Sequence, residues 1–213
     1  CTKEERDIMN LLKNKIILKT KNRTMISVVI PLYNKAHTIV NTLSTVLNQV
    51  YTDFEVVIVN DGSTDNGVNI IIQHFSDPRI RIINQKNAGV SNARNRGVKE
   101  SICQYIAFLD ADDEWHPDYL SIMAKTIRQY PHAALYCSGG IVHNADGSEN
   151  YRIAKKYINH IGVIDFFENP SQFAHTSGTV INKDFFIKTV GFPPNLYCLE
   201  DFALFVQLAL KGD

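Results

Sequence analysis

From Met25 onward, short apolar runs alternate with longer segments whose apolar residues have helical spacing. We predict strands at residues 26–30, 54–59, 79–83, 104–109 and 133–138. We predict helices at residues 37–49, 88–100, 117–130 and 202–211, with another that ends near residue 75. Strands joined by helices of this length form right-handed crossovers, and continuous apolar strands are buried on both faces. The alternation therefore predicts an α/β fold with a mostly parallel sheet flanked by helices.

The composition restricts the class of protein. The chain has 213 residues, 45% of them hydrophobic, which is enough for one principal domain. Lys plus Arg equals Asp plus Glu at 22 each, so the charge balance indicates no nucleic-acid partner. The four cysteines form no CxxC pair, which disfavours a zinc site and a dense disulfide framework and favours a cytoplasmic setting. No apolar run approaches the ~20 residues of a membrane helix.

Residues 1–24 differ from the rest of the chain. They are rich in Lys and Asn, with apolar residues spaced as in a short amphipathic helix. We interpret them as a lead-in before the domain, and the alternative is a helix that docks on a membrane surface or a partner. Because the chain begins with Cys1 rather than Met, we expect a fragment of something longer.

Three carboxylates, Asp110, Asp112 and Asp113, directly follow the apolar run 105–109. The C-terminal edge of a parallel sheet is where α/β proteins bind ligands. Neither GxGxxG nor GxxxxGK[ST] follows the first strand, so neither glycine-rich phosphate cradle is present there. Mg²⁺ or Mn²⁺ commonly binds through one or two carboxylates together with phosphate oxygens, so this acidic loop predicts a metal site for a phosphorylated ligand. The alternative is a solvated acidic turn at a helix N-terminus.

Five motifs in order carry a resemblance to a known family. They are VVIPLYN at 28–34, FEVVIVNDGSTD at 54–65, NAG with ARN within 87–95, FLDADD at 108–113, and ED at 200–201. Together they resemble the family 2 glycosyltransferases. The resemblance implies a GT-A fold, which is Rossmann-like and binds nucleotides, over residues 25–213. Residues 25–115 would form the nucleotide-binding half and residues 116–213 an incomplete acceptor half, because relatives usually continue further; we therefore expect a C-terminally truncated chain.

The resemblance also implies a chemistry. It implies a nucleotide-sugar donor, often a uridine diphosphate sugar, together with Mn²⁺ or Mg²⁺ and inversion by single displacement. Asp112 is then the first expected metal ligand. Asp110 is expected to contact the ribose or a metal-bound water, and Asp113 to support the metal or the donor sugar.

The nucleotide would be held by residues from three other turns. Asp61 is expected to accept a hydrogen bond from the base, and the alternative is an Asx-turn before a helix. Tyr33, after Pro31, is expected to stack on the base, and the alternative is an aromatic residue that closes the strand end. Arg94 is expected to reach the nucleotide, and the alternative is a surface arginine.

The acceptor side depends on the acid pair Glu200 and Asp201. By resemblance, Asp201 is the base that takes the acceptor proton and Glu200 orients it or contacts the acceptor; a helix-capping pair is the alternative. Ser177 and Gly178 resemble the segment that lines the donor sugar and acceptor, with a plain strand entry as the alternative. Trp115 forms a wall of the sugar site or else caps the core.

We therefore interpret the chain as a glycosyltransferase of bacterial surface polysaccharide assembly, with a saccharide or lipid-linked acceptor. It would work in the cytoplasm, at the inner face of the membrane and in peripheral contact with it. Two alternatives are a non-catalytic nucleotide-sugar binding module and a metal-dependent nucleotidyltransferase. The acid pair disfavours the first, and the absence of glycine after the first strand, in residues 31–36, disfavours the second.

Overall fold

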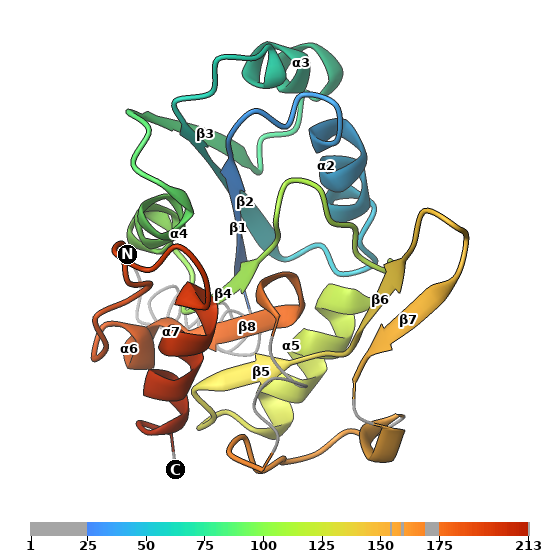
Figure 1. The fold of residues 1–213 in the computed structure, drawn as a ribbon, viewed down its shortest axis with the longest axis vertical. Coiled ribbons are helices and arrows are strands. Elements are labelled where there is room, and N and C mark those ends of the chain that lie inside the picture. The colour runs from blue at the N-terminus through green and yellow to red at the C-terminus, as the bar shows by residue number, and fades with distance from the viewer. Residues whose placement is uncertain (1–24, 154, 159, 169–174, 213) are drawn as a thin grey trace, which may run out of the picture.

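A six-stranded sheet forms the centre of the computed structural model, which describes residues 25–153, 155–158, 160–168 and 175–212. The strand order is β3-β2-β1-β4-β8-β5 (Figure 1). The strands are β1 (Ile26–Leu32), β2 (Phe54–Asp61), β3 (Ile80–Gln85), β4 (Tyr105–Phe108), β5 (Leu135–Cys137) and β8 (Thr179–Asn182). Strands β3, β2, β1 and β4 run parallel, and β8 is antiparallel to both β4 and β5. The predicted α/β fold with a mostly parallel sheet is confirmed.

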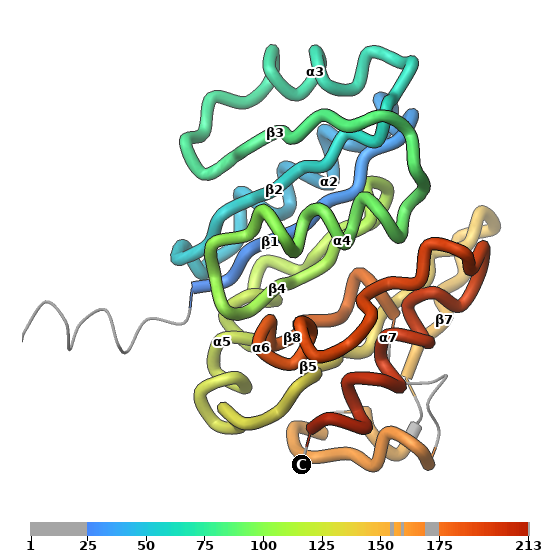
Figure 2. Tube along the Cα trace, turned by 90° about the vertical axis from the view of Figure 1, so that its left-hand side faces the viewer, coloured from blue at the N-terminus to red at the C-terminus, as the bar shows by residue number. Residues whose placement is uncertain are grey.

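Helices cover both faces of this sheet. One face carries α2 (Ile39–Leu47), α3 (Gly67–His74) and α5 (Tyr119–Gln129). The other carries α4 (Val90–Glu100), α6 (Lys183–Phe186) and α7 (Glu200–Ala209), the side that faces the viewer in Figure 2. Strand β1 shows why both faces need cover: Val28 and Ile30 pack into the first core cluster, whereas Val29 packs into the second. Alternate residues of a strand point to opposite faces, so apolar residues at every position require two helical layers.

Helix α4 lies unusually close to strand β1. A Cβ atom at Gly97 would lie 2.2 Å from a methyl carbon of Val29, so only glycine permits this approach. The close packing brings the first turns of α4, which carry Arg94, toward the end of β1. Glycine at this point therefore helps to position a predicted site residue.

Strand β8 begins directly after Ser177 and Gly178, where a strand entry was the alternative interpretation, but the sequence does not predict its place in the sheet. It inserts between β4 and β5, and its antiparallel register pairs Val180 with Ala107 and Asn182 with Tyr105. Because the two strands run in opposite directions, the start of β8 lies beside the end of β4. The short 3-10 helix η3 (Thr176–Gly178), which directly precedes β8, therefore reaches the acidic loop that follows β4.

A two-stranded hairpin of β6 (Gly140–His143) and β7 (Glu149–Arg152) projects from the central sheet (Figure 1). The 3-10 helix η1 (Lys155–Tyr157) follows it. Within the described residues, no helix combines the length and the apolar character needed to cross a membrane. The predicted lead-in of residues 1–24 lies outside the described residues, so its expected helix stays a prediction.

Candidate active site

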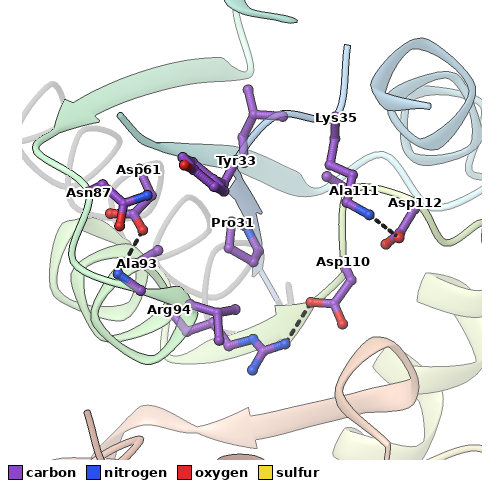
Figure 3. A pocket seen from close by; sticks show the side chains of 13 residues that line it. Pro31, Tyr33, Lys35, Asp61, Asn87, Ala93, Arg94, Asp110, Ala111 and Asp112 are labelled. Carbon is purple, nitrogen blue, oxygen red and sulfur yellow. Dashed lines mark hydrogen bonds and ion pairs between the residues drawn. The ribbon is translucent and has the colours of Figure 1, made fainter. Parts of the chain in front are cut away.

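A cavity of about 360 Å³ opens at the C-terminal edge of the sheet, where β1, β2 and β4 end (Figure 3). Strands β2 and β4 lie on opposite sides of β1, so this is the point at which the strand order reverses, where open α/β sheets bind their ligands. Six of the seven residues predicted to bind the nucleotide or the metal line the cavity: Pro31, Tyr33, Asp61, Arg94, Asp110 and Asp112. The seventh, Asp113, is not part of this lining. The structure therefore brings four separate turns into one site. The lining also includes Lys35 and Asn87, to which the sequence analysis assigned no individual role.

Asp61, at the end of β2, holds the loop that leads into α4. Its side chain is 3% exposed. One carboxylate oxygen accepts hydrogen bonds from Gln85 Nε2 (2.8 Å) and the Ala88 amide (2.9 Å), and the other accepts from the Gly89 amide (2.9 Å). A carboxylate has about four acceptor positions, so about one stays available to a ligand. The Asx-turn alternative is wrong for Asp61, because Asn60 accepts the turn's hydrogen bond from the Ser63 amide instead.

Tyr33 and Pro31 form the wall of the cavity between Asp61 and the acidic loop (Figure 3). The Tyr33 side chain is 47% exposed, which leaves an aromatic surface available to a planar ligand. The next residue, Asn34, has a positive φ of 52° and turns the chain away from the strand. Stacking of Tyr33 on a base stays a prediction.

Arg94 is buried, with 4% of its surface exposed, so the surface alternative is wrong. Its Nη2 donates to Asp110 at 2.7 Å and its Nη1 donates to Glu200 at 2.8 Å. Burial alone lowers the pKa of Arg94, but the two carboxylates outweigh it and raise that pKa. The guanidinium therefore joins the acidic loop to the acid pair, an arrangement that the sequence did not predict.

The three carboxylates of the acidic loop have different partners. Asp110 faces Arg94; burial raises its pKa, and the lowering effect of Arg94 does not fully offset this. Asp112 forms an ion pair with Lys35 at 2.6 Å, and both side chains are substantially exposed. Asp113 accepts a hydrogen bond from the Ser177 hydroxyl at 2.5 Å. Among the described residues, no group of three or more His, Cys, Asp or Glu side chains is arranged to hold a metal ion.

Helix η3 packs against the acidic loop. The Ser177 hydroxyl accepts a hydrogen bond from the Asp110 amide (3.0 Å), and the Ser177 carbonyl accepts one from Trp115 Nε1 (2.6 Å). Trp115 is 7% exposed and stacks on Tyr119 with ring centroids 4.3 Å apart. It lies in the core, as the alternative interpretation expects, and its role as a wall of the sugar site stays a prediction. Gly178 is also buried, and a Cβ there would lie 2.5 Å from the His175 ring.

The acid pair begins helix α7. Glu200 faces Arg94. One Asp201 oxygen accepts from the adjacent Phe202 amide at 2.7 Å. Both acids lie in the first turn of the helix, as the helix-capping alternative expects, but the N-cap residue Leu199 makes no side-chain capping bond. The other Asp201 oxygen accepts from the Thr176 hydroxyl at 3.1 Å, which no sequence pattern indicated. Leu199, at the N-cap, has a left-handed φ of 61°, a strained conformation that is often found next to functional residues.

Comparisons with known proteins agree with this architecture. The sequence profile described as "Glycosyl transferase family 2" matches residues 27–189. The uncharacterized glycosyltransferase YibD of Escherichia coli K12 is 44% identical over 104 residues, which are 48% of this chain and 30% of that protein. A chondroitin synthase of Escherichia coli is 40% identical over 119 residues, which are 55% of this chain and 17% of that protein.

Solved structures share the fold at low sequence identity. The structure of S. aureus TarS 1-349 in complex with UDP-GlcNAc has a TM-score of 0.68 and 20% identity, and the match covers 89% of this chain and 54% of that one. The mannosyltransferase PcManGT from Pyrobaculum calidifontis, in complex with GDP-Man and Mn²⁺, has a TM-score of 0.64 and 19% identity, and the match covers 88% of this chain and 52% of that one. The chain thus spans about half the length of these structures and less than a third of the curated relatives. Since the family profile matches well over half of its residues, the chain belongs to glycosyl transferase family 2 and has the GT-A fold.

Proposed function

We propose that this chain transfers a sugar from a nucleotide diphosphate sugar to a saccharide or lipid-linked acceptor, with inversion at the anomeric carbon and with the help of a divalent metal. A uridine diphosphate sugar is the first donor to test. One observation carries the proposal: Arg94 lies within hydrogen-bond distance of both Asp110 and Glu200. The acidic loop, which is predicted to bind the leaving diphosphate, and the acid pair, which is predicted to supply the base, therefore lie next to each other, as a single displacement requires.

The nucleotide would occupy the cavity at the ends of β1 and β2. Tyr33 offers an aromatic face, and Asp61 fixes the loop at Ala88 and Gly89 while keeping about one acceptor position for a base N–H. In this proposal, residues 25–115 form the nucleotide-binding half of the domain. Residues 116–213 form the acceptor half, which contributes η3 and the acid pair.

The acidic loop suits a divalent cation whose remaining ligands come from the donor. Mg²⁺ in phosphate-handling sites is bound by one or two carboxylates plus phosphate oxygens, so a site without three clustered acidic side chains fits this mode. Asp112 would be the main ligand and Asp110 the second, because both line the cavity, whereas Asp113 is bonded to Ser177. When bound, Mn²⁺ or Mg²⁺ would stabilise the negative charge that develops on the departing diphosphate.

Asp201 would act as the general base. Its two oxygens are held by Phe202 and Thr176, and each keeps a further acceptor position for the hydroxyl of the acceptor. Glu200 is committed to Arg94, so its role would be to fix the start of α7 rather than to move a proton. A base on the face opposite the leaving group takes the proton as the hydroxyl attacks, which gives inversion.

The proposed acceptor is supported by relatives named for polysaccharide synthesis, the chondroitin synthase of Escherichia coli and a hyaluronan synthase of Pasteurella multocida. A lipid-linked acceptor would place the enzyme at the inner face of a membrane. Incubation with saccharides and with lipid-linked saccharides separates the two acceptor classes, because only the second requires vesicles or detergent.

The test is a screen for nucleoside diphosphate release from a panel of nucleotide sugars, with and without acceptors and with Mn²⁺, Mg²⁺ or a chelator. Asp201→Asn should abolish transfer while leaving donor binding intact. Asp112→Ala should lose the metal-dependent part of the affinity for uridine diphosphate, measured by isothermal titration. Turnover by Asp201→Asn would refute the base assignment, and unchanged metal-dependent binding in Asp112→Ala would refute the metal assignment.

A further inference from the structure

Two adjacent hydroxyl side chains of η3 contact different parts of the site. Thr176 Oγ1 lies 3.1 Å from an oxygen of Asp201, and Ser177 Oγ lies 2.5 Å from an oxygen of Asp113. Both are buried, each 6% exposed. Resting on the proposed function above, we propose that Thr176 and Ser177 form a positioning pair: Thr176 orients the base, and Ser177 orients the acidic loop.

The backbone of η3 is held firmly enough for this role. The Ser177 carbonyl accepts from Trp115 Nε1, and the Gly178 carbonyl accepts from the Ser138 amide at 2.8 Å. Thr179, which begins β8, donates from its hydroxyl to the His175 carbonyl at 2.8 Å. These contacts connect η3 to the segment before α5, to the residue after β5 and to the residues on either side of η3. A side chain on such a support keeps its position relative to the sheet.

Thr176 limits the rotation of the Asp201 carboxylate. The last torsion of an aspartate is broad, so a carboxylate with a single partner can turn about its axis. The Phe202 amide holds one oxygen, and the Thr176 hydroxyl holds the other. Together they define the plane of the carboxylate and thus the direction of its free lone pairs. The loss of Thr176 would therefore change the orientation of Asp201 and leave the donor cavity intact.

Ser177 contacts the acidic loop rather than the proposed base. A hydroxyl has one donor and two acceptor positions, and here it donates to Asp113 while it accepts from the Asp110 amide. Both ends of the loop 110–113 are thereby held by one atom. Removal of this hydroxyl would release Asp113 and leave the Asp110 amide without this partner. We expect this change to affect the metal-dependent binding of the nucleotide rather than the proton transfer.

The experiment measures kcat, KM for the donor, and Mn²⁺-dependent affinity for uridine diphosphate in Thr176→Val and Ser177→Ala. Thr176→Val should lower kcat by about 10- to 100-fold, with KM and affinity for uridine diphosphate within about twofold of the unmodified chain. Thr176→Ser should restore most of kcat because it keeps the hydroxyl. Ser177→Ala should weaken Mn²⁺-dependent binding by about tenfold.

The matched control is Thr42→Val on α2, which removes a buried threonine hydroxyl that has no hydrogen-bond partner within the described residues. Thr42→Val should keep kcat within about threefold of the unmodified chain, and melting temperatures confirm that each variant is folded. The positioning role of Thr176 is overturned if Thr176→Val behaves like Thr42→Val while Asp201→Asn is inactive. Turnover by Asp201→Asn overturns the proposed base instead, so the two failures are distinguishable.

Discussion

Arg94 Nη1 lies 2.8 Å from a carboxylate oxygen of Glu200, although 106 positions separate the two residues in the chain. The other terminal nitrogen lies 2.7 Å from Asp110. A guanidinium is planar and presents its donors in a rigid fork, so one side chain can fix two carboxylates at once. The end of β4 and the start of α7 are joined through this buried cation.

The first prediction concerns Arg94→Lys. A lysine keeps the positive charge but is a point donor on a flexible stem, so it should hold Asp110 and Glu200 less well. We expect kcat/KM to fall at least tenfold, a change that corresponds to the loss of about one hydrogen bond to a charged group. Arg96→Lys is the matched control, because Arg96 is an exposed neighbour that pairs with Glu100 along the same helix. Equal activities of the two variants would contradict the bridging role.

A second prediction distinguishes two roles of Asp61. The carboxylate accepts two hydrogen bonds from amides of the loop before α4 and one from the Gln85 side chain at the end of β3, whereas an asparagine has only one acceptor oxygen. If Asp61 mainly holds this loop, Asp61→Asn should weaken the binding of uridine, guanosine and cytidine diphosphates by similar factors of about tenfold or more. Titration of the three nucleotides measures this. Selective loss of uridine diphosphate would instead support direct contact with the base. Asp118→Asn, at an exposed position, serves as the control.

A third prediction follows from the ion pair of Lys35 with Asp112. The lysine neutralises the carboxylate that is proposed to bind the metal, and the pair is substantially exposed. Exposed pairs contribute about 0.2–1 kcal/mol, so Lys35→Met should tighten Mn²⁺ binding without nucleotide by about 1.5- to 5-fold. Titration with Mn²⁺ checks this, with Lys125→Met on α5 as the exposed control. Weaker Mn²⁺ binding would contradict the proposed competition.

A fourth prediction concerns stability alone. Glu55, 7% exposed at the start of β2, accepts hydrogen bonds from the Ser27 hydroxyl, the Ile102 amide and the Arg81 guanidinium. Glu55→Ala leaves these donors without their acceptor and should lower the free energy of unfolding by about 2–4 kcal/mol. Denaturant titration measures this. Glu149→Ala on the exposed hairpin should change stability by less than about 0.5 kcal/mol. Donor binding by the folded Glu55→Ala protein should be unchanged, because Glu55 lies at the end of β2 opposite the cavity.

Local sequence patterns were sufficient to predict the parallel part of the sheet. Strands β1, β2 and β4 follow from continuous apolar runs, and β3 follows from a shorter, interrupted one. The turns after these strands meet at one edge because parallel strands end on the same side. This is why the sequence predicts Tyr33, Asp61 and Asp110 at one site, and all three line the cavity. The place of strand β8 in the sheet could not be predicted, because the antiparallel pairing of three of its residues with β4 depends on contacts more than seventy positions away.

The sequence by itself determined the class of fold, the family and the edge of the sheet that carries the site, since these depend on short-range periodicity and on motifs. Only the tertiary structure decided which groups face one another there. It made Arg94, whose contact with a nucleotide stays a prediction, a buried bridge between Asp110 and Glu200, and it placed Thr176 beside Asp201. The physical reason is that buried charges and hydroxyls are satisfied by whichever partner the packing of distant elements brings within reach, and no local pattern encodes that choice.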